Sequence, residues 1–165
     1  GVHVNGFVRG ADGARSLWIG RRGTNVRVCP GMLDNMVAGG QPIGLGLLEN
    51  VVKEAEEEAG VPTALAQQAT AVGSISYVME TQQGLRPDTM FCFDLEVPDG
   101  FQPACQDGSV VAYYLWPLEK VAEIVEHSFD FKFNCNLVII DFLMRHGFIS
   151  TDHPEYSALI DGLGR

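Results

Sequence analysis

The chain has 165 residues, the length of one ordinary domain, and 46% of them are hydrophobic while 19% are charged, so we expect a folded globule. Its 21 acidic and 11 basic residues give a formal net charge of −10, which repels phosphate backbones and argues against general DNA or RNA binding. No apolar run approaches the roughly 20 residues that span a bilayer, and no signal-peptide pattern is present. We therefore expect one cytoplasmic domain over residues 1–165, with no nucleic-acid or membrane partner.

The first part of the chain predicts short strands and then one helix. Alternating apolar and polar residues indicate the strands, and a 3.6-residue period indicates the helix. In chain order these elements are a strand over Val2–Arg9, a strand over residues 17–22, a short apolar piece at 36–38, a glycine-rich loop at 39–46 and a helix over Leu47–Ala59. Gly60 and Pro62 are expected to end the helix.

The rest of the chain continues the mixture of strands and helices. In chain order we expect paired strands at residues 71–81 and 89–97 around a loop at 83–88, a strand at 110–116, and helices at 118–126, 134–146 and 154–163. Pro117 suits the first turn of the first of these helices, and Gly147 suits the end of the second. Because no repeat or linker divides this pattern, we expect one α/β domain in which helices flank a sheet.

The helix over Leu47–Ala59 carries a stripe of acidic residues. At about 100° per residue, Glu57 and Glu58 lie within about 60° of Glu54, whereas Glu56 lies on another side of the helix. Carboxylates at these spacings repel one another, and the helix dipole disfavours negative charge near the C-terminus. A hard divalent cation such as Mg²⁺ would turn the repulsion into coordination. A solvated charged face is the alternative that charge alone leaves open.

Residues 39–61 resemble the Nudix box, which reads G-x5-E-x7-R-E-U-x-E-E-x-G-U, where U is aliphatic. Leu45 stands where the box has its first Glu, and Lys53 stands where it has Arg. The resemblance implies the Nudix fold, an α/β/α sandwich with a mixed sheet. The positions that fit the box are Gly39, Glu54, Glu57, Glu58, Gly60 and Val61.

A narrower likeness extends over nearly the whole chain, to the Nudix group related to thiamine pyrophosphokinase. In that group Leu or Ile at position 45 and Lys at position 53 are familiar. Members usually carry an additional N-terminal domain that is absent here, so we expect this sequence to be an excerpt of a longer protein. The segments that carry the likeness are LWIGRR at 17–22, PGMLDNMVAGG at 30–40, KEAEEEA at 53–59, FKFNC at 131–135 and DFLMRHG at 141–147.

This likeness implies a Mg²⁺- or Mn²⁺-dependent hydrolase that converts damaged or oxidised thiamine diphosphate analogues to monophosphates. By match to the box, Glu57 and Glu58 are metal ligands, and Glu54 is a further ligand or the catalytic base. Lys53 lies one helical turn from Glu57 and is expected to hold it in place. Further candidates are Arg21, Arg22 and Arg27, whose guanidinium groups suit a diphosphate, and Gly39 and Gly40, which permit close backbone approach.

Two other interpretations were compared with this hydrolase. The first is an enzyme that resembles isopentenyl diphosphate isomerase, which shares the fold. That resemblance would imply a proton relay through a Cys directly after the Asn-containing strand. Here no thiol follows Asn35 in residues 36–38, which disfavours that interpretation. The second is a catalytically weak Nudix module that binds a diphosphate ligand or a partner. It stays open because Leu45 and Ser109 both remove acid from the expected site.

Overall fold

The computed structural model describes residues 1–82 and 84–164, and every helix in these ranges is too short or too polar to span a bilayer. The strands are β1 (Val2–Arg9), β2 (Arg15–Arg22), β3 (Leu33–Asp34), β4 (Val37–Gly39), β5 (Thr70–Thr81), β6 (Gly84–Glu96) and β7 (Val110–Pro117). The helices are α1 (Leu47–Ala59), α2 (Thr63–Ala66), α3 (Leu118–His127), α4 (Cys135–Arg145) and α5 (Tyr156–Leu163).

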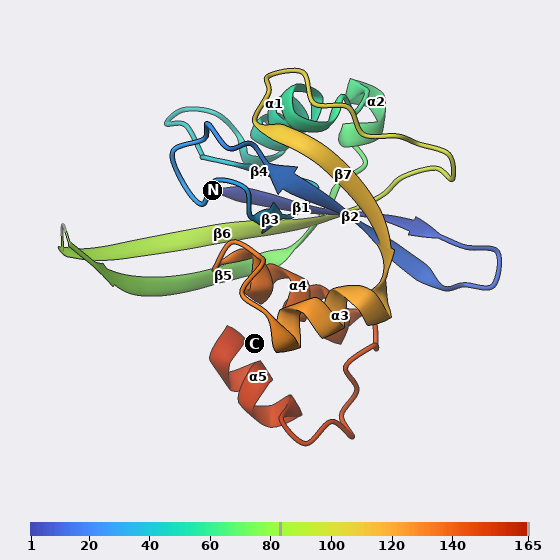
Figure 1. Cartoon of the computed structure of the whole chain (residues 1–165), viewed down its shortest axis with the longest axis vertical. Coiled ribbons are helices and arrows are strands. Elements are labelled where there is room, and N and C mark those ends of the chain that lie inside the picture. The colour runs from blue at the N-terminus through green and yellow to red at the C-terminus, as the bar shows by residue number, and fades with distance from the viewer. Residues whose placement is uncertain (83, 165) are drawn as a thin grey trace.

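The strands form one mixed sheet between two layers of helices. The order is β3-β2-β1-β6-β5, with β4 also paired to β1 and β7 also paired to β2. Strands β1 and β6 run parallel, whereas the other pairs are antiparallel. Helices α1 and α2 cover one face, and α3, α4 and α5 lie on the other (Figure 1). The predicted α/β/α sandwich with a mixed sheet is therefore confirmed.

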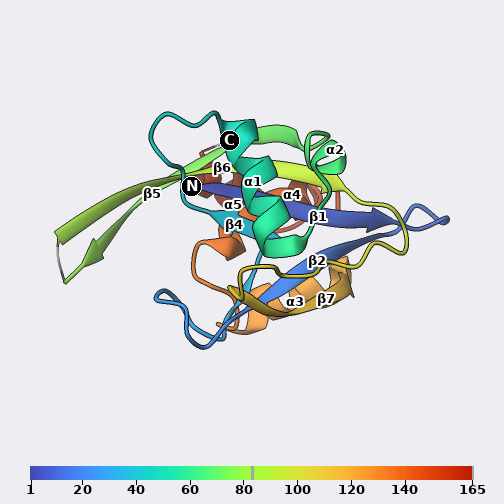
Figure 2. The same cartoon turned by 90° about the horizontal axis from the view of Figure 1, so that it is seen from above.

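Helix α1 has the bounds that its periodicity predicted, and its apolar face fixes it to the sheet. Val51, Ala55 and Ala59 are fully buried in a core cluster that includes the start of β1. Gly60 ends the helix with a φ of +61°, and its backbone N–H donates to the carbonyls of Ala55 and Glu56. The helix lies over β1 and β4 (Figure 2).

Residues of β1 alternate between the two faces of the sheet. Val2 and Val4 belong to the core cluster under α1, whereas Phe7 packs on the opposite side against Phe142 of α4, with ring centroids 5.6 Å apart. By the same alternation, His3 lies on the α4 side. Because the strand is buried on both faces, this polar side chain must find its partners inside the protein.

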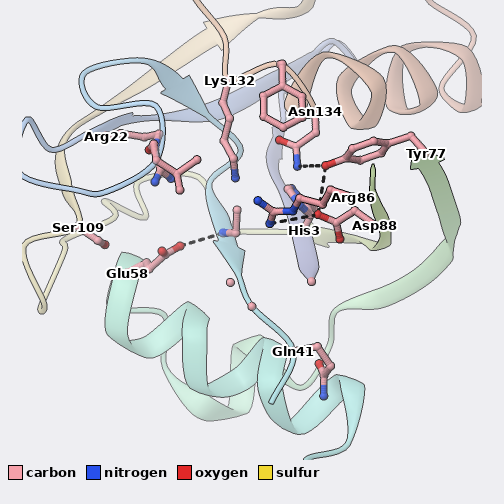
Figure 3. Close-up of a pocket in the computed structure, with 16 residues that line it drawn as sticks. His3, Arg22, Gln41, Glu58, Tyr77, Arg86, Asp88, Ser109, Lys132 and Asn134 are labelled. Carbon is pink, nitrogen blue, oxygen red and sulfur yellow. Dashed lines mark hydrogen bonds and ion pairs between the residues drawn. The ribbon is translucent and has the colours of Figure 1, made fainter. Parts of the chain in front are cut away.

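Strands β5 and β6 form a long hairpin that projects beyond the rest of the sheet (Figure 1). The loop expected at residues 83–88 is wrong over most of its length, because β6 begins at Gly84. Arg86 and Asp88 pair with Met79 and Tyr77 of β5. Gln83, which was included in that loop, lies outside the described residues. The longer hairpin brings polar and aromatic side chains to the same side of the molecule as the start of α4 (Figure 3).

Candidate functional site

A cleft of about 430 Å³ lies where β1 begins and β4 ends. The last turn of α1, the β5–β6 hairpin and the loop before α4 enclose it, so it joins segments far apart in the sequence (Figure 3). Its lining contains four of the residues that the sequence predicted to bind the metal or the diphosphate. These are Arg22, Gly39, Gly40 and Glu58.

Glu58 forms the acidic side of the cleft. Its Oε2 accepts a 2.8 Å hydrogen bond from the backbone N–H of Ala38 in β4. The Tyr113 hydroxyl can donate to the Glu58 carbonyl, 2.7 Å away, or to the Met36 carbonyl, 3.1 Å away, and so links the last turn of α1 to the residue before β4. Burial raises the pKa of the Glu58 carboxyl to about 8, although the Ala38 hydrogen bond opposes the rise. The carboxylate therefore favours a proton or a cation beside it.

The other two acids of the stripe share a cation. The Lys53 ammonium donates to Glu54 Oε1 at 3.1 Å and to Glu57 Oε2 at 2.8 Å, so the predicted contact between Lys53 and Glu57 is confirmed. A Cβ at Gly39 would lie 2.3 Å from the Glu54 carboxyl carbon, so a larger residue at position 39 would displace Glu54. Within the described chain, the cleft lining contains Glu58 but neither Glu54 nor Glu57.

Asp34 holds two cations at the cleft. Its Oδ2 lies 2.6 Å from Arg22 Nη1 and 3.8 Å from Lys132 Nζ, and both of these side chains line the cleft. Its Oδ1 accepts hydrogen bonds from the Asn35 backbone N–H at 2.9 Å and from the Cys135 thiol at 2.7 Å. Burial raises the pKa of the Cys135 thiol, which keeps it protonated as a donor. The arrangement fixes a pair of positive groups that suits phosphate oxygens.

The structure brings one of the three candidate arginines to the cleft. The pairing of β2 with β7 shifts register between Arg21 and Arg22, so their contacts, and not regular alternation, show where each side chain lies. The Arg21 guanidinium donates to the Gly31 carbonyl at 2.7 Å and lies 5.8 Å from the centre of the Tyr114 ring. Arg27 is exposed in the connection between β2 and β3. Of residues 1–82 and 84–164, the cleft lining includes neither Arg21 nor Arg27.

Comparisons with known proteins find two similar plant sequences. Over 161 residues the chain is 49% identical to Nudix hydrolase 20, chloroplastic, of Arabidopsis thaliana, a match that covers 98% of the chain and 42% of that protein. It is 48% identical over 155 residues to Nudix hydrolase 24, chloroplastic, of the same plant, with 94% of the chain and 42% of that protein covered. Over nearly its whole length the chain is therefore similar to proteins named as Nudix hydrolases.

Further comparisons bear on the Nudix fold and on the extent of the match. The NUDIX domain of Shewanella oneidensis NrtR, solved as a complex with ADP ribose, superposes with a TM-score of 0.65 at 16% identity and covers 87% of this chain and 85% of that one. At this identity the likeness shows the fold alone. No protein-family model matches the chain. The chain spans less than half the length of the two curated relatives, and their names do not support the predicted cytoplasmic location.

The loop of the Nudix box is held by amides where the general box has its first acid. Leu45 is half-buried, and its carbonyl accepts a hydrogen bond from Gln41 Nε2 at 2.6 Å. Asn50 Nδ2 donates to the Gly40 carbonyl at 2.9 Å and to Gln41 Oε1 at 3.1 Å. These contacts fix the glycine-rich loop against α1 without a carboxylate at position 45.

The second departure, Ser109, lines the cleft beside an acid from its own loop. Its backbone N–H donates to Asp107 Oδ1 at 2.8 Å, and the Asp107 carboxylate contributes to the raised pKa of Glu58. The loop before β7 therefore places an acid near Glu58, although Ser109 itself carries none.

The aromatic end of the cleft, formed by Tyr77 and Phe133, was missed by reasoning from the sequence. The two rings meet edge to face with centroids 6.0 Å apart. Asn134 Nδ2 donates to the Tyr77 hydroxyl at 3.3 Å, and that hydroxyl donates to Asp88 Oδ2 at 3.2 Å. Arg86 lies 3.7 Å from the same Asp88 oxygen. In Figure 3 these groups lie across the cleft from Glu58 and Ser109.

Proposed function

We propose that residues 1–165 form one Nudix hydrolase domain that cleaves a small-molecule diphosphate with the help of Mg²⁺ or Mn²⁺. The observation that supports this most strongly is the arrangement of opposite charges in one cleft. Glu58 provides a partly buried carboxylate, while Arg22 and Lys132 provide cations held by a separate carboxylate. A metal-bound diphosphate needs both kinds of partner, because its oxygens bind guanidinium and ammonium groups while its metal binds carboxylates.

The proposed metal ligands and catalytic residues are Glu54, Glu57 and Glu58. The raised pKa of Glu58 marks a buried position where a positive charge would be stabilising, which fits a divalent cation. Glu54 and Glu57 already share the Lys53 ammonium, so a divalent ion would compete with Lys53 for them. Mg²⁺ usually retains several waters, so few protein ligands suffice. When bound, the cation would neutralise charge on the diphosphate oxygens.

The diphosphate would lie between the cations and the backbone of the glycine-rich loop. Arg22 presents a planar guanidinium fixed by Asp34, and Lys132 adds a second charge from the loop before α4. Gly39 and Gly40 line the same cleft, where the absence of side chains allows close approach of a ligand to the backbone. Arg21 and Arg27 have no part in this arrangement.

For the substrate, we propose damaged or oxidised thiamine diphosphate analogues, which the enzyme would convert to monophosphates. The likeness of five separate sequence segments to the group related to thiamine pyrophosphokinase supports this choice. Tyr77 and Phe133 add physical support, because aromatic side chains at the end of the cleft away from Glu58 can pack against a planar heterocycle. A ring there and a diphosphate near Arg22 would fit one elongated ligand.

A second candidate is a Nudix module that binds a diphosphate without turning it over. The observation that favours it is Leu45, which occupies the position of an acid in the general box and is held in place by amide contacts. Such a protein would still use Arg22 and Lys132 to bind phosphate oxygens. It would differ from the hydrolase only in the absence of metal-dependent turnover.

A panel of diphosphates separates the two candidates. Cleavage of the diphosphate should be followed by phosphorus NMR with thiamine diphosphate, its oxidised analogue, ADP-ribose and a simple alkyl diphosphate, each with Mg²⁺, with Mn²⁺ and with chelator. The hydrolase hypothesis predicts metal-dependent cleavage that is fastest with the oxidised analogue. Glu56→Gln is the matched control for Glu58→Gln, since Glu56 is exposed outside the cleft. Binding without cleavage of any compound would support the second candidate.

A further inference from the structure

A chain of buried polar side chains leads from the cleft to α4. His3 Nδ1 lies 3.0 Å from Asn35 Oδ1, Asn35 Nδ2 donates to Asn5 Oδ1 at 3.1 Å, and Asn5 Nδ2 donates to Asp94 Oδ1 at 3.2 Å. Arg145 of α4 then donates to both oxygens of Asp94, at 2.6 and 3.0 Å. All members except Arg145 are at least nine-tenths buried.

This series of hydrogen bonds determines which ring nitrogen of His3 carries a hydrogen. Burial works to raise the pKa of Asp94, but hydrogen bonds led by Arg145 outweigh it and lower that pKa, so the carboxylate is ionised and only accepts. The Asn5 amide nitrogen therefore faces Asp94, and its oxygen faces Asn35. In turn the Asn35 oxygen faces His3. An amide oxygen can only accept, so His3 Nδ1 must be the donor.

The other nitrogen of His3 is left as an acceptor toward the cleft. Burial lowers the pKa of His3, which keeps the ring neutral near pH 7, so Nε2 holds a lone pair. His3 lines the cleft, and over residues 1–82 and 84–164 no hydrogen bond uses its Nε2. That atom is also not among the fully buried polar atoms that lack a partner. Nε2 is therefore not fully enclosed by the protein, although His3 as a whole is only 4% exposed.

His3 lies close to the aromatic end of the cleft. One of its ring nitrogens lies within 4.8 Å of Cys135 Sγ and of an Asp34 carboxylate oxygen, and Cys135 follows Asn134 at the start of α4. Asn134 donates to the Tyr77 hydroxyl, and Tyr77 contacts Phe133. Phe133 keeps 43% of its surface exposed, so it can still cover a ligand. Through these contacts, one neutral acceptor and two aromatic rings belong to the same part of one cleft.

We infer that this end of the cleft binds a planar aromatic ring that carries an N–H donor, with His3 Nε2 as the acceptor and Tyr77 and Phe133 against the ring. The role of His3 rests on the proposed function, because the diphosphate would occupy the side of the cleft near Arg22 and Lys132. His3 is then a specificity-determining residue. A ring that offers only acceptors would place a lone pair opposite the lone pair of Nε2, and a ring with a methylated nitrogen would place a methyl group there. Either ring would bind more weakly.

Two non-hydrolysable probes test the acceptor directly. One is 2-(4-aminophenyl)ethyl methylenebisphosphonate, which has N–H donors, and the other is its N,N-dimethyl counterpart, which has none. With Mg²⁺ present, calorimetry should show that the wild-type protein binds the amino probe about tenfold more tightly. His3→Leu should abolish this preference, whereas His3→Gln, which keeps an acceptor oxygen, should retain part of it.

The wild-type protein also offers a spectroscopic readout that a structural role for His3 would not move. Nitrogen NMR should show His3 as a neutral ring with hydrogen on Nδ1. The Nε2 signal should shift on addition of the amino probe and not of the dimethyl probe. Phe133→Ala should weaken both probes, while Phe129→Ala is the matched control, since Phe129 is 93% exposed in the same loop and does not line the cleft.

Equal affinity of the wild-type protein for the two probes, or hydrogen on Nε2 in the free protein, would overturn the assignment. A preference that survives in folded His3→Leu would overturn it as well. If the amino probe is preferred as expected while no diphosphate is hydrolysed, the ring-binding end of the cleft stands and the proposed catalytic function fails.

Discussion

The backbone N–H of Ala38 donates a 2.8 Å hydrogen bond to Glu58 Oε2, and this contact joins the last turn of α1 to the strand at the edge of the cleft. It fixes the direction of a carboxylate that is largely removed from solvent. Because burial raises its pKa to about 8, the metal-free protein holds a proton on Glu58 near neutral pH. A divalent cation at this position would have to displace that proton.

The stability of the metal-free protein should therefore fall as pH rises from about 5 to 8. The pKa of Glu58 is raised from 4.5 to about 8 on folding, so its contribution is fully present below pH 4.5 and is lost as pH rises through 8. The shift corresponds to at most about 4 to 5 kcal/mol. Denaturant unfolding in chelator should show Glu58→Gln as the more stable protein at pH 8. Identical pH slopes for the wild type and Glu58→Gln would contradict this.

Replacement of the individual acids of α1 should separate ligands from bystanders. Glu57→Gln and Glu58→Gln are each expected to lower the rate of hydrolysis about 100-fold or more, which is about 2.7 kcal/mol of barrier, because each removes a proposed metal ligand. Glu56→Gln should have little effect, since Glu56 is exposed on another side of the helix. The measurement is kcat/KM at saturating Mg²⁺. A larger loss of kcat/KM in Glu56→Gln than in the other two variants would show that the metal binds to a different face of α1 from the one proposed.

The two adjacent arginines of β2 offer a matched pair. Arg22→Lys should raise KM about tenfold, because an ammonium cannot replace a planar guanidinium that is held by Asp34 while it binds phosphate. Arg21→Lys should leave KM nearly unchanged, because Arg21 contacts Gly31 and does not line the cleft. Steady-state kinetics of both variants on the preferred diphosphate test this. A higher KM for Arg21→Lys than for Arg22→Lys would refute the placement.

Leu45 should make metal binding depend on the ligand. Without an acid at position 45, we expect the free protein to bind Mg²⁺ only in the millimolar range, about 4 kcal/mol, and a diphosphate analogue to tighten it by linkage. Leu45→Glu should tighten Mg²⁺ binding to the free protein about tenfold, since it adds a carboxylate beside the acidic stripe. Calorimetry with and without analogue measures both effects. Micromolar Mg²⁺ binding to the free wild-type protein would be incompatible with this prediction.

The helix and most strands could be predicted from the sequence because their signals are local. Leu47–Ala59 combines an apolar period with Gly60 at its end, and the structure has the same bounds. The prediction of a loop at residues 83–88 was wrong. Arg86, Pro87 and Asp88 are typical of a polar turn, but pairing with β5 extends the strand to Gly84. Tertiary pairing overrode local preference there.

The candidate site was predictable only where one motif carried it. Glu58 and Gly39 belong to a single stretch of sequence, so the spacing of the Nudix box alone predicted that both belong to one site. His3, Tyr77 and Phe133 lie on β1, on β5 and before α4, and they meet only because the sheet and α4 bring them together. Arg21 and Arg22 could not be ranked from the sequence, because the register shift between them and their contacts appear only in the structure.

The most direct test of a metal-dependent hydrolase is a phosphorus NMR time course. The wild-type protein and Glu58→Gln would each be incubated with oxidised thiamine diphosphate and Mg²⁺. With the wild type, the two diphosphate signals should disappear while monophosphate ester and inorganic phosphate appear in equal amounts, and chelator should stop the conversion. With Glu58→Gln, conversion should be about 100-fold slower. An unchanged diphosphate spectrum with the folded wild-type protein, or conversion that persists in chelator, would contradict the proposed function.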